Sequence, residues 1–415
     1  MGMSIILAAR ETDHPVKFTP PPFASYYPTD ESFTGDTGAH VHALTRSHTI
    51  GTSKDNLWWV ELGGNLDSIH DADRVREQLI CNIYGVWDHI KNHGDHGMEN
   101  WDLDWVGFLP GKRESRRYVG DVMMTEQDVL SGGHFEDEIA YGGWPLDDHN
   151  PYGMEKNEHS NTPSVSIPLS EIYGLPFRSL YSRNIENLMF AGRNISVTHV
   201  VLSSCRVMAT CALLGQAMGT GAAVALQYGC LPRGVYQDHM DEVQQALLED
   251  GVFLPHIPRR ISAQTLRASI NLPEEAREVL LNGVERPRTE DDENGIVQKV
   301  GDSLIFTFDH PEEISTLRLR FDPDFSRMSI SDNMKMRVFA MKLHTGKDFR
   351  PVRTAATIVR EFAVWADGEE IFRTEDNYLS LVKVPVKRTA KEIRIQWLAT
   401  NGAEDVRLFG ADLIS

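Results

Sequence analysis

Cysteine is scarce in this sequence, and its few residues are not clustered. Only four of the 415 residues are cysteine, and no two of them form a C-x-x-C pair. This excludes a disulfide framework and a cysteine-based zinc site. The four positions are Cys81, Cys205, Cys211 and Cys230.

Basic residues are also fewer than acidic residues. The 41 Lys and Arg residues face 60 Asp and Glu residues, so the formal net charge is −19. A surface of that sign repels nucleic acid phosphates and anionic membranes. We therefore expect neither nucleic acid nor a membrane among the partners.

The sequence also has no uninterrupted hydrophobic run and no leader pattern. Its most apolar stretch, Val207 to Leu226, is interrupted by Gln216 and is rich in Gly and Ala, which predicts a buried helix rather than a membrane span. Because Met1 to Ile6 contain no Lys or Arg, no signal peptide is predicted, and the compartment stays open.

Two nucleotide-binding motifs are missing as well. The sequence contains neither a G-x-G-x-x-G turn nor a Walker A motif. A dinucleotide-binding strand–turn–helix unit should carry the first of these, because its glycines let the backbone approach the pyrophosphate. No such unit is therefore predicted in this chain.

The residues that are present suffice for packed domains. Apolar residues make up 41% and charged residues 24% of the chain, and the length predicts two to three domains. From Asp71 to Lys91 apolar residues recur every three or four positions, which predicts an amphipathic helix. Residues 111–148 are dense in charge, glycine and aromatics, which predicts a loop-rich, functional segment.

A strand, a loop and a helix are predicted next. Asn187–Ala191 is a short apolar strand that ends at Gly192, and a long Ala/Gly helix runs from about Val207 to Gln227. Further along, Pro258 and the Arg259–Arg260 pair indicate a linker. We place the domain boundary there, giving domains over 1–257 and 258–415.

Beyond residue 260 the hydrophobic pattern changes to period two. Alternating segments such as Leu304–Phe308 and Ile393–Trp397 are separated by turn dipeptides such as Asp367–Gly368 and Asn401–Gly402. Short strands at this spacing predict an independent antiparallel β-sandwich.

The segment around the strand, loop and helix carries a specific motif. It consists of Asn187–Ser196, then His199, Ser204–Thr210 and Gly215–Gly219. This string closely resembles the carboxy-terminal flavin motif of FAD-dependent oxidoreductases related to fumarate reductase and succinate dehydrogenase flavoproteins. With Gly111–Arg117, Asp128, Gly143–Asp147 and His149, which resemble the substrate-side segment of that family, the resemblance covers roughly residues 1 to 255.

The residues themselves favour contact with a flat, electron-accepting ligand. A strand that ends at Gly192 lets the backbone approach a ligand closely. A helix beginning near Val207 offers unpaired N–H groups and a positive dipole end, and Arg206 adds a fixed charge. The alternative is a small-residue helix packed tightly on a sheet through residues such as Gly215 and Gly219.

The resemblance implies an α/β fold that is a partial FAD-binding oxidoreductase, with FAD as cofactor and hydride transfer to or from an unidentified, carbohydrate-related small molecule as the reaction. It also implies an amino-terminally truncated member, without the ADP-binding half that normally holds the pyrophosphate. We therefore expect the isolated chain to bind FAD weakly or not at all and to be inactive alone. The implied cofactor-binding residues are Ala191, Gly192, Arg193, Asn194, Ser196, Arg206, Met208, Thr210, Gln216 and Gly219. Many members have an acidic residue where this chain has Arg193.

The candidate catalytic residues are Arg113, His149 and His199. Arg113 belongs to the basic cluster Lys112–Arg117, which could bind a substrate carboxylate or phosphate or form a solvated charged loop. His149 and His199 are candidate proton donors or acceptors, with a structural role as the alternative.

Two other signals are weak. His89 and His93 have the i,i+4 spacing of a metal pair, with His96 nearby, but without an H-E-x-x-H motif a solvated helix terminus is expected. Asn194–Ser196 is formally a glycosylation sequon, but it lies inside the flavin motif.

The second domain is similar to galactose-binding-like, discoidin-type jelly rolls, on its strand pattern and a few turn residues. Such modules bind glycans or pad an enzyme. Two functions therefore stay open: an oxidoreductase chain, or a non-catalytic glycan-binding or partner subunit with a degenerate flavin site. A separate ADP-binding chain as partner would reconcile them.

Overall fold

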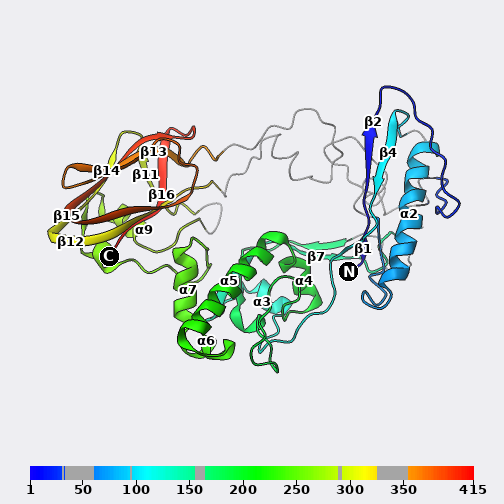
Figure 1. Ribbon diagram of the computed structural model, residues 1–415, viewed down its shortest axis with the longest axis horizontal. Coiled ribbons are helices and arrows are strands. Elements are labelled where there is room, and N and C mark those ends of the chain that lie inside the picture. Colours follow the sequence, from blue (N-terminus) through cyan, green and yellow to red (C-terminus); the bar gives the residue numbers. More distant parts are fainter. Residues whose placement is uncertain (30–31, 33–59, 94–95, 155–163, 288–291, 325–353) are drawn as a thin grey trace.

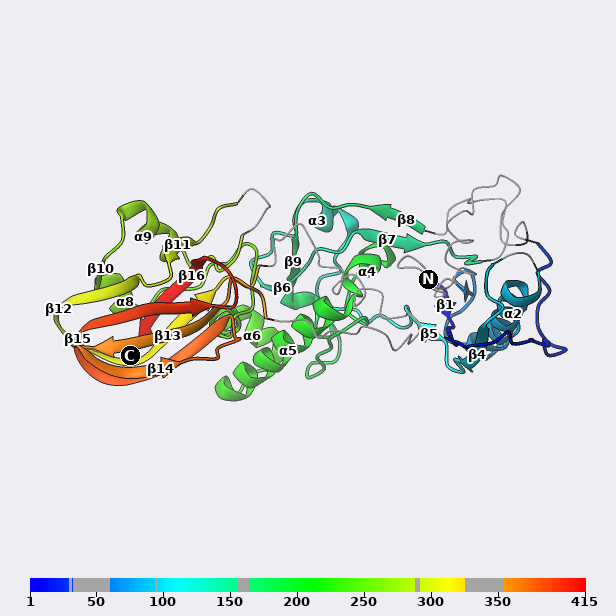
Figure 2. The same cartoon turned by 90° about the horizontal axis from the view of Figure 1, so that it is seen from above.

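The computed structural model describes residues 1–29, 32, 60–93, 96–154, 164–287, 292–324 and 354–415. Its elements form three groups in a row, each around its own hydrophobic core. The first group and the carboxy-terminal sandwich lie at opposite ends, with the second group between them (Figures 1 and 2). Helices with short sheets followed by an antiparallel β-sandwich are the architecture that the sequence predicts.

The first group packs one long helix against short strands. β1 (Met3–Ser4) pairs with β3 (Glu61–Leu62) and β5 (Gly111–Lys112), and β2 (Leu7–Glu11) pairs with β4 (Trp101–Val106), all antiparallel. The predicted amphipathic helix is α2 (Ala72–Asn92), and its periodic apolar residues are buried as expected. They are Val75, Leu79, Ile83, Val86 and Ile90.

The histidines near the end of α2 differ from expectation. His89 is only 1% exposed, and its Nδ1 lies 2.7 Å from the carbonyl oxygen of Tyr27. His96 Nε2 lies 3.1 Å from His89 Nε2. The prediction of a solvated helix terminus is therefore wrong, because residues 18–27 pack across this end of the helix. Among the described residues no group of three potential metal ligands is formed.

The second group packs helices and two antiparallel strand pairs around one core in the described part of the chain. Its helices are α3 (Glu126–Leu130), α4 (His199–Cys205), α5 (Met208–Tyr228), α6 (Pro232–Asp238) and α7 (Met240–Glu249), with a 3₁₀ turn, η2 (Phe177–Ser179). β6 (Glu138–Gly142) pairs with β9 (Tyr173–Pro176), and β7 (Leu146–His149) pairs with β8 (Ser164–Ile167). The segment predicted as loop-rich thus includes β5, α3, β6 and most of β7.

The strand predicted at Asn187–Ala191 is not formed. This segment makes a single bridge, between Met189 and Tyr181, and the Phe190 N–H donates to the Leu180 carbonyl over 2.8 Å. The pairing stops there because Gly192 turns the chain with a φ of +92°. The short helix α4 was not predicted; it intervenes between this turn and α5.

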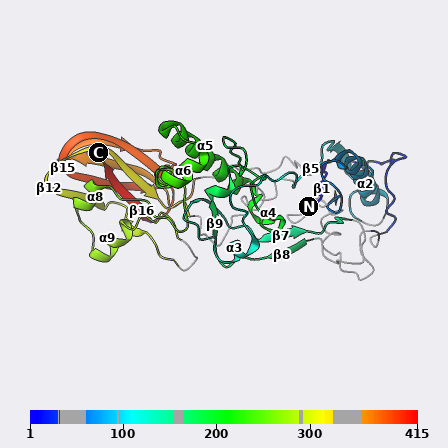
Figure 3. The same ribbon diagram turned by 90° about the horizontal axis from the view of Figure 1, so that it is seen from below.

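The long predicted helix is α5, but it is buried on one side only. By length and composition it is apolar enough to cross a membrane, and 39% of it is buried in the protein. Its inner face packs into the core, where a side chain at Gly221 would come within 2.7 Å of the Phe177 ring. Gly215 and Gly219 face open space instead. The predicted buried helix is therefore buried on one face, and the alternative of tight packing through Gly215 and Gly219 is not what the structure has. In Figure 3 the helix lies along one edge of the second group.

The carboxy-terminal group is a seven-stranded antiparallel sheet that closes on its own core. The strand order is β11-β16-β12-β15-β13-β14, with β10 added beside β12. The strands are β10 (Ser269–Ile270), β11 (Ile296–Lys299), β12 (Ser303–Phe321), β13 (Val359–Ala366), β14 (Glu369–Thr374), β15 (Leu381–Thr400) and β16 (Asp405–Ile414).

The long strands β12 and β15 curve this sheet into a sandwich. Register shifts interrupt their pairing near Thr307 and Ile314, where bulges bend the pair. Asp367 and Gly368 both have positive φ, so they form the tight turn that the sequence predicts between β13 and β14. Two short helices that the period-two pattern did not indicate, α8 (Ala263–Arg267) and α9 (Glu274–Leu280), precede the sheet.

The connection between the second group and the sandwich is not an exposed linker. Arg259 is 3% exposed, and its guanidinium contacts Glu249 on α7, Glu285, and Asp412 on β16 at 2.6 to 3.0 Å. Arg318 on β12 also pairs with Glu285. The interpretation of Arg259 as a solvated linker residue is therefore wrong, because both groups supply carboxylates that bury it.

Candidate active site

A buried carboxylate–imidazole pair lies where the first group meets the second. Glu61 on β3 and His149 at the end of β7 are 0% and 3% exposed, and His149 Nδ1 lies 2.9 Å from Glu61 Oε2. The turn after β7 folds onto β3, where the Met154 N–H donates to the Glu61 carbonyl over 2.9 Å. Gly153 in this turn has a φ of +61°, and a side chain there would collide with that carbonyl. Glycine thus permits the close approach of the two segments.

Two arginines compensate the charge around this pair. Arg113 Nη1 lies 3.1 Å from Glu61 Oε2. Arg206 Nη2 lies 3.2 Å from His149 Nε2 and 3.3 Å from Asp147 Oδ2. We call Glu61, Arg113, Asp147, His149 and Arg206 the buried charge cluster.

The carboxylates and the imidazole of the buried charge cluster are shifted toward their charged forms. Burial disfavours charge on His149, but hydrogen bonds with Asp147 and Glu61 outweigh it and raise its pKa. Burial likewise opposes ionisation of Glu61, yet its bond to His149 and the charge of Arg113 lower its pKa. His149 Nε2 accepts from Arg206 when the ring is neutral, and Asp147 Oδ2, at 3.6 Å, faces the same nitrogen when it is protonated. The ring therefore has a partner in both protonation states.

A second imidazole lies next to this cluster. His199, the first residue of α4, places Nδ1 at 2.8 Å from Glu114 Oε2 and Nε2 at 2.9 Å from Asp148 Oδ1. These two hydrogen bonds raise the pKa of His199 to about 9. Although burial opposes it, the bond to His199 and the Met1 amino group lower the pKa of Glu114 to about 2. His199 is thus a cation at neutral pH.

The corner between α4 and α5 gathers positive charge. The Thr198 side chain caps α4 by accepting from the Val201 N–H over 3.3 Å. Arg206 ends α4, and Val207 precedes α5, whose first N–H groups receive no side-chain cap. These free N–H groups and the helix dipole make the start of α5 electropositive beside the Arg206 guanidinium.

The segment before α4 leaves polar atoms without hydrogen bonds. Gly192 adopts a left-handed backbone with a φ of +92°. Within the described part of the chain, Asn194 Oδ1 and Ser196 Oγ are buried and have no hydrogen-bond partner. Such atoms are uncommon in folded proteins and indicate either a missing ligand or water, or strain.

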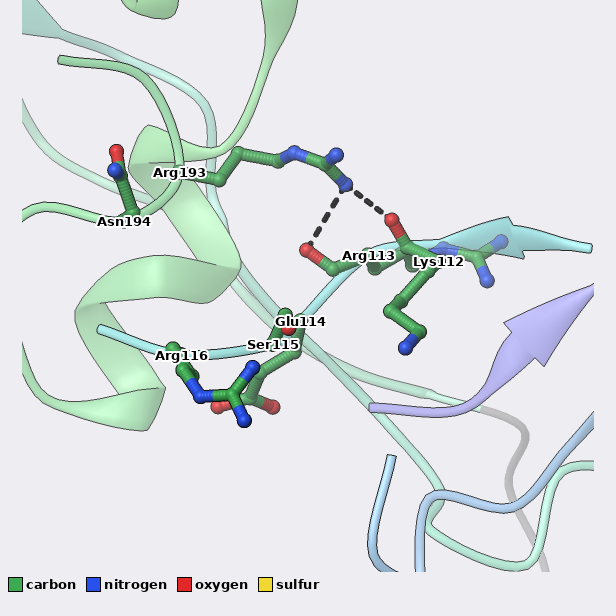
Figure 4. A pocket seen from close by; sticks show the side chains of 7 residues that line it. All are labelled: Lys112, Arg113, Glu114, Ser115, Arg116, Arg193 and Asn194. Carbon is green, nitrogen blue, oxygen red and sulfur yellow. Dashed lines mark hydrogen bonds between the residues drawn. The ribbon is translucent and has the colours of Figure 1, made fainter. Parts of the chain in front are cut away.

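A pocket of about 290 Å³ lies between this segment and the chain that follows β5. It is lined by residues 112–116 on one side and by Arg193 and Asn194 on the other (Figure 4). Arg193 spans the gap, since its Nη1 donates to the carbonyl oxygens of Lys112 and Arg113. The pocket therefore adjoins the buried charge cluster through Arg113, which belongs to both.

The predicted site residues occupy three different places. The three catalytic candidates come together, because Arg113 and His149 share Glu61 while His199 contacts residues adjacent to both in sequence. Ser196 and Thr210 are buried, at 0% and 5% exposure. Ala191, Gly192, Arg193, Asn194 and Arg206 lie along the turn and the helix corner, whereas Met208, Gln216 and Gly219 are exposed on the outer face of α5.

Four acidic residues of this region were not among the predicted site residues: Glu61, Glu114, Asp147 and Asp148. Glu61 had a signal, since it is the single charge in the segment Trp58–Leu62, ahead of Gly63 and Gly64. A lone carboxylate among apolar residues indicates a buried, paired group. Glu114 and Asp148 lie directly beside Arg113 and His149 in sequence, and Asp147 lies two positions before His149. Nothing in the sequence pattern pairs Glu114 and Asp148 with His199.

Comparisons with known proteins match one family model to this chain. Residues 5–247 match the family described as FAD dependent oxidoreductase. No curated protein matches the chain.

Carbohydrate-binding modules are among the solved structures that match. A family 32 module of Streptococcus pneumoniae EndoD is 14% identical, covers 35% of this chain and 91% of its own, and has a TM-score of 0.24. A module from a family 31 glycoside hydrolase of Clostridium perfringens is 8% identical and covers 38% of this chain and 98% of its own, also with a TM-score of 0.24. A fucose binding module of Streptococcus pneumoniae is 10% identical over 37% and 98% of the two chains, with the same TM-score.

Proposed function

Because the chain belongs to the family of FAD dependent oxidoreductases, we propose that it acts in hydride transfer between FAD and a small molecule. The observation that carries the proposal is the juxtaposition of the electropositive start of α5 with the buried charge cluster, through Arg206. The electropositive start of α5 suits a ring that accepts electrons, and the buried charge cluster holds protons. When bound, FAD supplies the hydride acceptor or donor.

The residues present fit the flavin end of FAD. The open left-handed turn at Gly192, the unpartnered Asn194 Oδ1 and the uncapped N–H groups of α5 offer a close backbone approach and free polar atoms. Arg206 and the α5 dipole would stabilise negative charge on the ring edge that they face.

The residues present do not fit the ADP end of FAD. The sequence has no G-x-G-x-x-G turn, and every strand ladder among the described residues is antiparallel, unlike a dinucleotide-binding βαβ unit. We propose that this chain holds FAD weakly by itself, and that a separate ADP-binding chain completes the site.

The two histidines have different roles in the proposed site. His149, buried against Glu61 and offered either Arg206 or Asp147 at Nε2, can gain or lose a proton without losing its partners. His199, with a pKa of about 9, stays charged at neutral pH and supplies a fixed positive charge. We therefore assign proton transfer to His149 and electrostatic positioning to His199.

Titration of the full chain with FAD and riboflavin, followed by quenching of flavin fluorescence, tests the proposal. Since only the flavin end is contacted, both should bind weakly and with affinities within about threefold of each other. Arg206→Met should weaken binding and lower the potential of bound flavin. Arg360→Met, at an exposed sandwich arginine, is the matched control; Arg259 is unsuitable because it is buried.

Absence of quenching by either flavin, or an Arg206→Met variant that binds as the wild type does, would contradict the placement of the flavin at the α4–α5 corner. Tight, stoichiometric FAD binding would contradict the proposed weak binding and the need for an ADP-binding partner. Neither result would alter the family membership of the chain.

For the sandwich we propose glycan binding as a second candidate function, with residues 258–415 as the module. Tyr378 is 67% exposed in the loop between β14 and β15, and buried Asn377 anchors that loop by donating to the Val359 carbonyl over 2.7 Å. An exposed aromatic on an anchored loop suits stacking on a sugar. Screening the chain against galactose-terminated glycans tests it. Tyr378→Ala should abolish binding, whereas Val297→Ala, at an exposed apolar residue of β11, should not.

A further inference from the structure

The pocket beside the buried charge cluster is positively charged within an acidic protein. Four of its seven lining residues are cationic, and one, Glu114, is acidic. The chain as a whole carries a net charge of −19. Glu114 is already engaged, because its carboxylate contacts both His199 and the Met1 amino group. The side chains that line the pocket therefore carry a net positive charge.

Among the residues that the structure describes, three of the four cations have no carboxylate counter-ion. Arg113 pairs with Glu61, and the Arg193 guanidinium donates to backbone carbonyls. In the described ranges of the chain, no carboxylate lies within ion-pair distance of Lys112 Nζ or the Arg116 guanidinium, although both line the pocket. Figure 4 shows the Arg193 side chain reaching across to the carbonyl oxygens of Lys112 and Arg113. Cations left uncompensated around one cavity attract an anion into it.

We infer that this pocket binds an oxyanion group, a carboxylate or a phosphate, of the small molecule on which the enzyme acts. That the anion belongs to the substrate rests on the proposed function; that the pocket binds an oxyanion does not. Guanidinium groups bind both kinds of oxyanion in bidentate fashion, and Lys112 adds a point charge. A volume of about 290 Å³ is at the small end for ligand pockets and suits a small acid.

Calorimetric titration of the flavin-free full chain at constant ionic strength tests the inference. The probes are malonate, inorganic phosphate, ADP and uncharged malonamide. Malonate or phosphate should bind and malonamide should not, and whichever of the two anions binds tighter identifies the group as carboxylate or phosphate. The Lys112→Met/Arg116→Met variant should bind that anion at least about tenfold more weakly.

The matched control is Arg360→Met/Lys391→Met, which removes the same two charges from exposed sandwich positions. It should bind within about twofold of the wild type, and both variants should unfold at the wild-type temperature without anion. If anion binding were weakened equally in the pocket variant and in the control variant, the effect would come from the net charge of the protein and not from the pocket. This result would overturn the inference. ADP binding that is tighter than phosphate and malonate and lost in the pocket variant would also overturn it, because the pocket would then hold a cofactor pyrophosphate. Anion binding without flavin binding would sustain the oxyanion site while the proposed flavin placement fails.

Discussion

At the scale of single residues, two carboxylates from distant segments set the charge of His199. Glu114 and Asp148 hydrogen-bond to opposite nitrogens of the ring and raise its pKa to about 9. A raised pKa stabilises the folded state below the unfolded value of about 6.5, and this contribution is lost as the pH rises through 9. The ring therefore supports the fold most at neutral and mildly acidic pH.

We expect the Glu114→Gln/Asp148→Asn variant to return the pKa of His199 toward 6.5, as measured by NMR titration of the imidazole. The difference in melting temperature between wild type and variant should shrink from pH 6 to pH 10, because the wild-type advantage depends on a charged ring. Glu404→Gln, at an exposed acid of the sandwich, should move neither quantity. A wild-type pKa near 6.5 would show that these carboxylates do not act on His199 in solution.

Glu61 is the residue on which the buried charge cluster depends most. Replacement by Gln keeps the side-chain volume but leaves Arg113 and a protonated His149 without their shared anion. Removing one partner of a buried ion pair costs about 3–5 kcal/mol. We expect Glu61→Gln to lower the free energy of unfolding by that amount in urea titrations and to lower the pKa of His149. A loss as small as that of the exposed control Glu404→Gln would mean that water reaches the cluster.

At the scale of elements, replacing a glycine of α5 by alanine is expected to have opposite effects on stability at the exposed face and at the buried face of the helix. Gly219 faces open space, so an alanine there gains helix propensity of about 1 kcal/mol. A methyl group added at Gly221 would come within 2.7 Å of the buried Phe177 ring, and overpacking of that kind costs about 1–3 kcal/mol. The same substitution should therefore change stability in opposite directions two residues apart.

Urea unfolding of Gly219→Ala and Gly221→Ala measures this difference directly. We expect the order of stability to be Gly219→Ala, wild type, Gly221→Ala. Each variant is the matched control of the other, since both add one methyl group to the same helix. If Gly221→Ala were the more stable of the two, the packing of α5 on η2 through this glycine would be wrong.

At the scale of the whole molecule, buried ion pairs join the second group to the sandwich. Arg259 contacts Glu249, Glu285 and Asp412, and the last of these is 1% exposed. We expect Arg259→Met to destabilise the protein by about 3–5 kcal/mol, because it leaves buried Asp412 uncompensated. Arg360→Met should have no effect on unfolding.

A double-mutant cycle measures the interaction energy between Arg259 and Asp412 separately from the cost of each single substitution. Arg259→Met/Asp412→Leu should cost less than the sum of the single variants, because neither charge is then left alone. Chemical denaturation followed by tryptophan fluorescence provides the measurement. Strict additivity would show that Arg259 and Asp412 act independently, and the coupling of the two groups would then rest on other contacts.

The sequence by itself determined the features that depend on near neighbours. The helices α2 and α5, the alternating strands of the sandwich and the Asp367–Gly368 turn all follow from periodicities or residue preferences spanning a few positions. The family also followed from the closely spaced motif segments between Asn187 and Gly219. These features can be predicted from the sequence because each depends on residues within one helical turn or one strand pair.

Only the tertiary structure decided which charges meet. Glu61 and His149 are 88 residues apart, and Arg259 and Asp412 are 153 apart. Their contacts depend on how separately folded segments pack, which no periodicity encodes. The same holds for the exposed face of α5, since a helix pattern shows which residues are apolar but not which of them find a partner. The sequence thus set the elements and the family, and packing between distant elements set the buried charges of the site.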